Sequence, residues 1–391
     1  MKTEKQADIK KIGILTYFWA HNSGTFLQAF SMLDIFRRKF PDTKVELIDV
    51  KHRKVFFKPG LGNLTVSQFF RDIKRHTLFE KAKNEYLKTG KDSLVTKDSY
   101  RAWEFIDKQG YDLIVVGSDT ILQFLSFNHA ENSVPVYWLP PSLKCKKVMC
   151  AASCGGITYD RLSKKQRDAC RESLNGFDLL GVRDDATLSL MNELGVNDES
   201  KLSFVPDPTF AMEIDYCHSD NLIKRKNLDF SKPSIGFFLH RKTGPAPDVA
   251  NYFRNRGYQI IALSAAGYAD ICLTDISPFE WAGVYKGLQL VITGAFHGAV
   301  FSLKNLTPVL SFINNRNFIT ANGLSKYRSL MDSFDLGDTN IIDGEELNRS
   351  DQIIRKAEQV IKNHDKDSIQ NKLTDHRKQF ELYIEKIRQV I

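Results

Sequence analysis

Short apolar runs alternate along this chain with segments in which apolar residues recur at helical spacing. The run at 11–18 is rich in apolar and β-branched residues; it is followed by a turn at 22–25 and by helical spacing over 26–36. A further apolar run at 45–50 completes a strand–helix–strand order. Because such crossovers join parallel strands and are right-handed, the opening predicts a parallel sheet.

The same order returns after residue 108. Predicted strands lie at 113–116, 147–152, 179–182 and 203–209, and predicted helices at 163–174 and 184–194. Residues 51–108 break the order, because basic and aromatic residues are mixed there around a helical stretch near 66–88. We predict that 51–108 is an insertion, helical in part, that lies over or beside a site.

The second half of the chain repeats the alternation after a charged segment at 215–232. Predicted strands lie at 234–239, 259–263, 290–293 and 308–312, with helices near 246–256 and 278–287 and one that begins at 296. We therefore predict an α/β protein with two doubly wound, Rossmann-like domains facing a cleft. The domains are expected at 1–220 and 221–345, and an amphipathic helical tail at 346–391 is expected to pack on the body.

Composition and charge limit the classes of function. A length of 391 residues with 42% hydrophobic residues suits two globular domains. The net charge of +8 fits a solvated basic surface or attraction to an anionic membrane face. No nucleic-acid reader motif accompanies it, so we expect no nucleic-acid partner.

Location is predicted from what the printed sequence lacks. It has no secretory signal and no 18-residue apolar run, and its six cysteines are scattered. We expect a cytoplasmic protein, with peripheral contact at the cytoplasmic membrane face as an option. No metal-binding motif occurs, so no metal site is expected.

Four polar segments lie where predicted strands end, which is where ligands of such sheets bind. They are His21-Asn22-Ser23-Gly24, Gly117-Ser118-Asp119, Val182-Arg183-Asp184-Asp185 and Phe296-His297-Gly298. The first either brings backbone amides to an anion or sugar or forms a capped turn. In the second, Asp119 either orients a hydroxyl or caps the next element.

The third and fourth segments carry the stronger chemistry. Arg183 can hold a carboxylate or phosphate with its planar fork, or form a structural pair with Asp184 or Asp185. His297 can exchange a proton near neutral pH, or be structural, and the amide of Gly298 can meet an anion. Asp207 lies between two prolines, which predicts a rigid turn at the domain hinge.

Six blocks, taken in order, resemble the polysaccharide pyruvyl transferase family. They are Gly13-Ile-Leu-Thr-Tyr17 with Asn22-Ser-Gly24 and Leu27-Gln-Ala29, the segment 111–119, Ala151-Ala-Ser153, Val182-Arg-Asp-Asp185, Val205-Pro-Asp-Pro-Thr209, and Phe296-His-Gly298 with Val300-Phe-Ser302. The resemblance covers about residues 12–335. It departs at 120–124, where family members often have a tryptophan, and at Gly294 and Ala295, where polar residues are common.

The resemblance implies a GT-B-like fold and an enzyme that uses phosphoenolpyruvate as co-substrate, with no cofactor. Its expected product is a pyruvate ketal on two hydroxyls of a surface-polysaccharide sugar or its lipid-linked precursor. It implies that Arg183 clamps the donor and that His297 is the acid–base group or phosphate contact. Asn22, Gly24, Ser118, Asp119 and Gly298 are expected at the substrates, and Arg241, Lys326 and Arg328 are candidates from placement. Alternatives are a nucleotide-sugar glycosyltransferase of the same fold and a silent relative that acts as a binding module.

Overall fold

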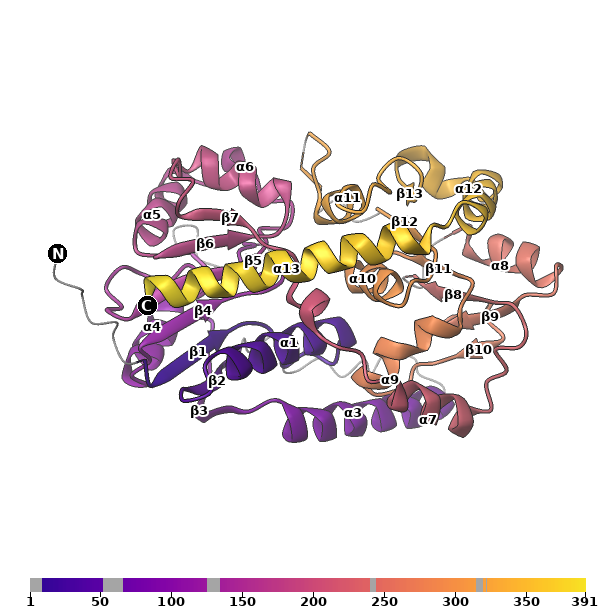
Figure 1. Ribbon diagram of the computed structural model, residues 1–391, viewed down its shortest axis with the longest axis horizontal. Coiled ribbons are helices and arrows are strands. Elements are labelled where there is room, and N and C mark those ends of the chain that lie inside the picture. The colour runs from indigo at the N-terminus through magenta and orange to yellow at the C-terminus, as the bar shows by residue number, and fades with distance from the viewer. Residues whose placement is uncertain (1–8, 52–65, 125–133, 240–243, 314–318, 321) are drawn as a thin grey trace.

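The computed structural model describes residues 9–51, 66–124, 134–239, 244–313, 319–320 and 322–391. Two parallel sheets, each covered by helices, form two domains side by side (Figure 1). This arrangement confirms the predicted α/β class with two doubly wound domains. No helix in the described part of the chain is both long and apolar enough to cross a membrane.

The first sheet has seven parallel strands in the order β3-β2-β1-β4-β5-β6-β7. Their bounds are β1 Lys11–Leu15, β2 Lys44–Lys51, β3 Thr89–Val95, β4 Leu113–Val116, β5 Lys146–Ala152, β6 Leu179–Val182 and β7 Leu202–Phe204. The helices between them are α1 Ser23–Lys39, α3 Val66–Tyr86, α4 Ser99–Lys108, α5 Lys164–Asn175 and α6 Asp185–Glu193. The strand order reverses between β1 and β4, so a ligand crevice is expected at the carboxyl ends of these two strands.

The described residues of 51–108, which are 51 and 66–108, include strand β3 of the first sheet, so this part is not a separate insertion as predicted. Strand β3 pairs in parallel with β2 and forms the edge of the sheet, and α3 and α4 flank it in sequence. The strand was missed because most of its residues are exposed, as an edge position allows, so no apolar run marks it. The predicted helical stretch near 66–88 corresponds to α3.

The second sheet has six parallel strands in the order β10-β9-β8-β11-β12-β13. Their bounds are β8 Ser234–Phe238, β9 Gln259–Ala262, β10 Ile271–Cys272, β11 Leu290–Thr293, β12 Val309–Phe312 and β13 Ile341–Ile342. Its helices are α8 Ala246–Arg254, α9 Pro278–Gly283, α10 Phe296–Lys304, α11 Lys326–Asp332 and α12 Ser350–Lys362. The 3-10 turn η2 Pro208–Ala211 and helix α7 Tyr216–Lys226 connect the domains. Helix α7 packs on α9, so the predicted boundary near residue 220 falls inside a helix of the second domain.

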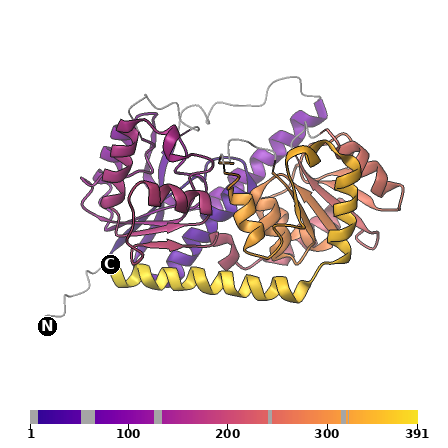
Figure 2. The ribbon, with the colours of Figure 1, turned by 90° about the horizontal axis from the view of Figure 1, so that it is seen from above.

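Helix α13, Lys366–Val390, runs along both domains (Figures 1 and 2). Phe380, Ile384 and Ile387 on its inner face are buried in the core. The hydroxyl of Tyr383 donates to the carbonyl of Met149 on β5. The tail predicted as amphipathic therefore ties the end of the second domain back to the first.

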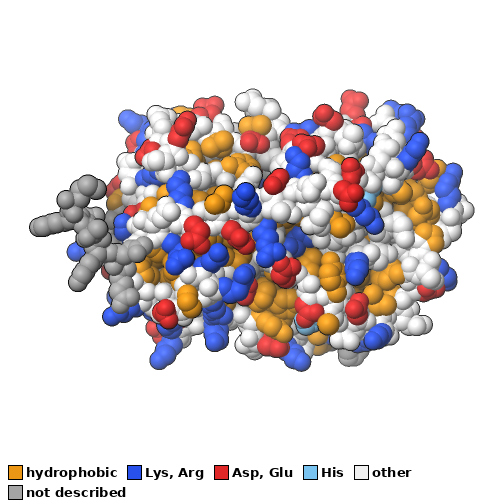
Figure 3. All heavy atoms as spheres, in the orientation of Figure 1, with side chains coloured by type: hydrophobic (Ala, Val, Ile, Leu, Met, Phe, Trp, Pro, Cys, Tyr) orange, Lys and Arg blue, Asp and Glu red, His pale blue; other side chains and the backbone are white. Residues whose placement is uncertain are grey.

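The face of the molecule crossed by α13 carries mixed charge. Figure 3 shows Lys and Arg side chains interspersed with Asp and Glu on this face, without a large field of one sign. Interspersed charges of this kind are typical of a solvated surface. This face therefore gives no support to a nucleic-acid or membrane partner.

Candidate active site

A cleft with a volume of about 1010 Å³ lies between the two domains. From the first domain it is lined by Asn22, Ser23, Gly24 and Thr25 at the start of α1, by Asp119 after β4, and by Arg71, Asp72 and Arg75 on α3. From the second domain it is lined by residues that follow β8, β9 and β11, including Phe296 and His297, and by Lys326 and Tyr327. Both sheets thus turn the carboxyl ends of their strands toward one cavity, as expected for a ligand site.

The loop after β4 presents Asp119 to this cleft. Gly117 has φ 138°, and a Cβ there would lie 1.9 Å from the carbonyl oxygen of Cys150, so only glycine fits. Ser118 is fully buried, and its Oγ donates to Oε1 of Gln28 on α1 at 2.7 Å. Asp119 itself has φ 79°, a strained value for a residue with a side chain. Ser118 therefore ties this loop to α1, and it is not among the residues that line the cleft.

Arg183 joins two carboxylates that are distant in sequence. Its Nη2 lies 2.8 Å from Oδ1 of Asp119, and its Nη1 lies 2.5 Å from Oδ2 of Asp207. The guanidinium also lies over the ring of Phe296, 4.4 Å from its centroid. The Arg183 side chain is only 1% exposed and does not line the cleft. Both ends of its fork already hold aspartates, which favours a structural pairing over the predicted donor clamp.

The aspartates that follow Arg183 in sequence have other partners. Asp184 caps α6, since its Oδ1 accepts hydrogen bonds from the amide and hydroxyl of Thr187. Asp185 accepts a hydrogen bond from Ser329 of α11, across the domain boundary. The structural Arg–Asp pairing considered from the sequence therefore exists, but with Asp119 and Asp207.

His297 lies in the first turn of α10 and lines the cleft. Its Nε2 lies 3.6 Å from Oδ2 of Asp207 and has no hydrogen-bond partner among the described residues. Burial alone would raise the pKa of Asp207, but His297 and Arg183 hold it well below its ordinary value. An ionised carboxylate therefore faces the imidazole of His297 in the cleft.

Lys326, at the start of α11, completes the cluster. Its Nζ lies 3.6 Å from Oδ1 of Asp119. Burial alone would raise the pKa of Asp119, but Lys326 and Arg183 hold it well below its ordinary value. Burial also lowers the pKa of Lys326, against the opposing effect of Asp119. The site thus combines ionised carboxylates with buried cationic side chains.

The amino end of α10 adds partial positive charge beside His297. Its cap residue, Ala295, has no side-chain cap, and the first turn holds no acidic residue. The first amides of a helix have no acceptor within it, so those of Phe296, His297 and Gly298 can bind an anion. Gly298 also lets α10 pack closely, because a Cβ there would lie 2.3 Å from Oγ1 of Thr293.

Helix α1 meets α10 across the domain boundary. A Cβ on Gly24 would lie 2.4 Å from both Cγ and Nδ1 of His297, so this glycine sets how closely the helices approach. Asn22 caps α1, since its Oδ1 accepts a hydrogen bond from the amide of Thr25 at 3.1 Å, and it also lines the cleft. The capped turn considered for this segment therefore exists, and it lies at the cleft.

The remaining predicted residues do not join the cluster. Arg328 points to Asp343, with Nη2 and Oδ2 3.0 Å apart, and is not among the residues that line the cleft. Arg241 lies outside the described residues.

The sequence patterns gave no chemical role to Asp207 or to Gln28. Asp207 follows β7, which ends at Phe204, so the rule that ligands bind at strand ends also applies to it.

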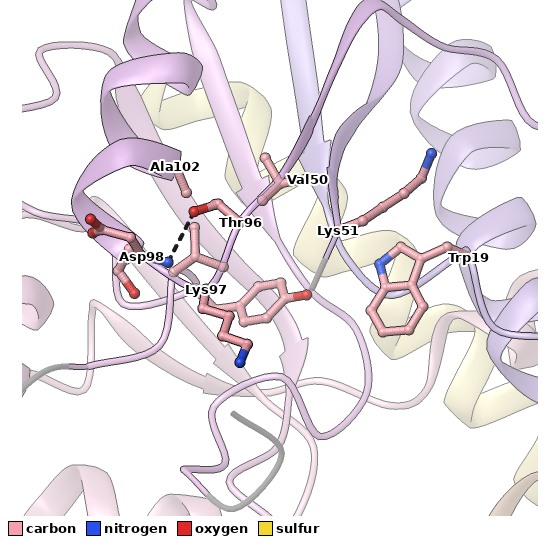
Figure 4. Close-up of a pocket in the computed structure, with 10 residues that line it drawn as sticks. Trp19, Val50, Lys51, Thr96, Lys97, Asp98 and Ala102 are labelled. Carbon is pink, nitrogen blue, oxygen red and sulfur yellow. Dashed lines mark hydrogen bonds between the residues drawn. The ribbon is translucent and has the colours of Figure 1, made fainter. Parts of the chain in front are cut away.

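A second pocket lies in the first domain, beside the ends of β2 and β3. Figure 4 shows Trp19 and Lys51 on one side of it and Thr96, Lys97 and Asp98 on the other. Its volume of about 20 Å³ has room for a water molecule and not for a sugar ring. The cleft between the domains is therefore the candidate active site.

Comparison with known proteins identifies a family whose model matches most of the chain. The family model described as "Polysaccharide pyruvyl transferase" matches residues 22–316, which include Asp119, Arg183, Asp207 and His297. No curated protein sequence shows a significant match to this chain.

Solved structures with a similar fold have low sequence identity. A UDP-GlcNAc 2-epimerase from Methanocaldococcus jannaschii has a TM-score of 0.55 at 12% identity, with coverage of 91% of this chain and 94% of that one. A UDP-GlcNAc 2-epimerase from Neisseria meningitidis, bound to UDP-GlcNAc, has a TM-score of 0.52 at 9% identity, with coverage of 97% and 100%. Such similarity shows the fold alone, and it confirms the predicted GT-B-like pair of domains.

Proposed function

The chain belongs to the polysaccharide pyruvyl transferase family, and from this premise we propose that it transfers the pyruvyl group of phosphoenolpyruvate to two hydroxyls of a glycan sugar. The observation that carries the proposal is His297, beside the Asp207 carboxylate, at the amino end of α10 in the cleft. The reaction needs a proton donor and an anion site together, and this position supplies both.

The chemistry proceeds through a cation at C2 of phosphoenolpyruvate. A proton adds to the C3 methylene carbon and leaves positive charge on C2. One sugar hydroxyl adds to C2 and passes its proton to the group that protonated C3, and the C2–O bond to phosphate then breaks with its electrons on phosphate. The second hydroxyl adds to C2 and passes its proton to the released phosphate, which closes the cyclic ketal.

The residues of the cluster divide these tasks. His297, which lies 3.6 Å from the Asp207 carboxylate, gives the proton to C3. Lys326 and the first amides of α10 hold the phosphate and the carboxylate of the donor.

The roles of Asp119 and Arg183 follow from their pairing. Asp119 lines the cleft as an ionised carboxylate and stabilises the positive charge at C2. Its lowered pKa makes it a weak base, so it orients the sugar hydroxyl instead of removing its proton. Arg183 is a positioning residue, because it contacts both carboxylates and does not line the cleft.

A thermal-shift experiment separates this function from use of a nucleotide-sugar. Phosphoenolpyruvate at about 100 times its Kd is expected to stabilise the folded protein by about 2.7 kcal/mol, whereas UDP-GlcNAc is expected to have no effect. Lys326→Met should lose the stabilisation, and Lys362→Met, a change at an exposed position on α12, should keep it. Stabilisation by UDP-GlcNAc and not by phosphoenolpyruvate would overturn the proposal.

A further inference from the structure

Two histidines and a glutamate gather beside the cleft, outside the catalytic cluster. His21 lies between β1 and α1, and His76 and Glu80 lie on α3. One ligand atom from each residue can be chosen so that all three lie within 4.8 Å of one another. Nε2 of His21 is 3.1 Å from Oε1 of Glu80, and the two histidine rings have centroids 4.6 Å apart.

The backbone already brings these side chains together. Residues four apart on a helix share a face, so His76 and Glu80 lie one turn apart on α3. The guanidinium of Arg75 donates to the carbonyl oxygen of His21 at 2.7 Å and fixes the loop against the helix. His21 and Glu80 are half-buried and His76 is exposed, so an ion from solvent can reach all three.

We propose that His21, His76 and Glu80 form a binding site for a divalent transition-metal ion of the zinc class. Two imidazole nitrogens and one carboxylate oxygen are ligands that Zn²⁺ and Co²⁺ accept, with water in the remaining position. Mg²⁺ and Ca²⁺ prefer oxygen ligands, so this set discriminates against them. No sequence motif marks this site, because His21 and Glu80 are 59 positions apart.

Lys83 competes with a metal ion for this site. Its Nζ contacts both carboxylate oxygens of Glu80, at 3.0 and 2.9 Å. A bound cation has to share the carboxylate with this ammonium and bears its repulsion. Removal of the charge in Lys83→Met therefore tightens metal binding.

The proposed ion would link α3 to the loop that precedes α1. Arg71 and Arg75 of α3 line the cleft, as does Asn22, the residue next to His21. Helix α3 also reaches the second domain, where Lys74 pairs with Asp275 at 3.2 Å. The metal would thus hold one wall of the cleft in place, whichever substrates the cleft accepts.

Calorimetric titration of the metal-free full-length protein with ZnCl₂ tests the site. The wild type is expected to bind one Zn²⁺ at this site, and His21→Gln and His76→Gln should each weaken it at least tenfold. His218→Gln is a matched control because the exposed fractions of the two side chains are alike, 36% for His218 and 37% for His21. Lys83→Met should bind more tightly than the wild type.

Cobalt spectra show whether a cysteine thiolate binds the metal, and Tm measurements show whether each variant is folded. CoCl₂ should produce a visible spectrum without a thiolate charge-transfer band, because no cysteine is in the site. Zn²⁺ should raise the Tm of the wild type and of Lys83→Met but not of His76→Gln. Absence of saturable binding, or equal binding by the wild type, His21→Gln and His76→Gln, would overturn the proposal.

Discussion

Replacement of Gly24 by alanine tests whether α1 and α10 meet as closely as the site requires. The added Cβ would lie 2.4 Å from Cγ and Nδ1 of His297 and 2.5 Å from its Cβ. Ordinary carbon contacts are about 3.5–4.0 Å, so His297 or one of the helices has to move by about 1 Å. A displacement of about 1 Å in an active site costs about 100-fold in rate. We therefore expect Gly24→Ala to lower kcat/KM by about 100-fold.

The local helix gives the opposite expectation, which makes the experiment decisive. Gly24 lies in the first turn of α1, where alanine favours the helix over glycine by up to ~1 kcal/mol. Without the contact to His297, the substitution would be harmless or stabilising. Gly244→Ala is the matched control, because a Cβ there meets no atom of the described residues within 4 Å. Rates are measured as phosphate released from phosphoenolpyruvate, and a Gly24→Ala rate within twofold of the wild type would refute the contact.

Three further substitutions test the charge network. Arg183→Lys cannot hold Asp119 and Asp207 together, so urea denaturation should show a loss of about 3–5 kcal/mol, and wild-type stability would contradict this pairing. The pKa of Asp207 is lowered in the folded protein, so its charge stabilises the fold above the unfolded pKa of about 4. The loss of stability in Asp207→Asn should therefore be largest at pH 7 and shrink below pH 4. A loss that stays constant with pH would count against this role of Asp207. His297→Gln should lower turnover by 10²–10⁴-fold with its Tm preserved, and an active variant would remove His297 from proton transfer.

Much of the fold could be predicted because the central strands are buried on both faces. Such strands appear as continuous apolar runs, as at β4 and β6, where all four residues are buried. Edge strands lack this pattern: β3 is mostly exposed, and β10 and β13 have two residues each. The alternation of apolar and polar positions therefore identified the sheets but not their edges.

The location of the candidate site could be predicted from the sequence, but the contacts of its residues could not. Strand ends located Asp119, Arg183 and His297, because parallel strands bring these ends to one cleft. The partners of Arg183 depend on strand order, since Asp119 is 64 positions away and Asp207 is 24. The sequence instead suggested Asp184, the next residue, as a partner of Arg183, but Asp184 caps α6.

Pyruvyl transfer from phosphoenolpyruvate to a glycan is tested most directly by following both products of the reaction. The purified protein is incubated with phosphoenolpyruvate and an extract of lipid-linked glycans, and both the phosphate released and the mass of the glycan are recorded. Phosphate release is expected to depend on the glycan and on His297, and the glycan is expected to gain the mass of one pyruvate ketal for each phosphate released. Glycan modification that proceeds without phosphoenolpyruvate and requires a nucleotide-sugar would contradict it.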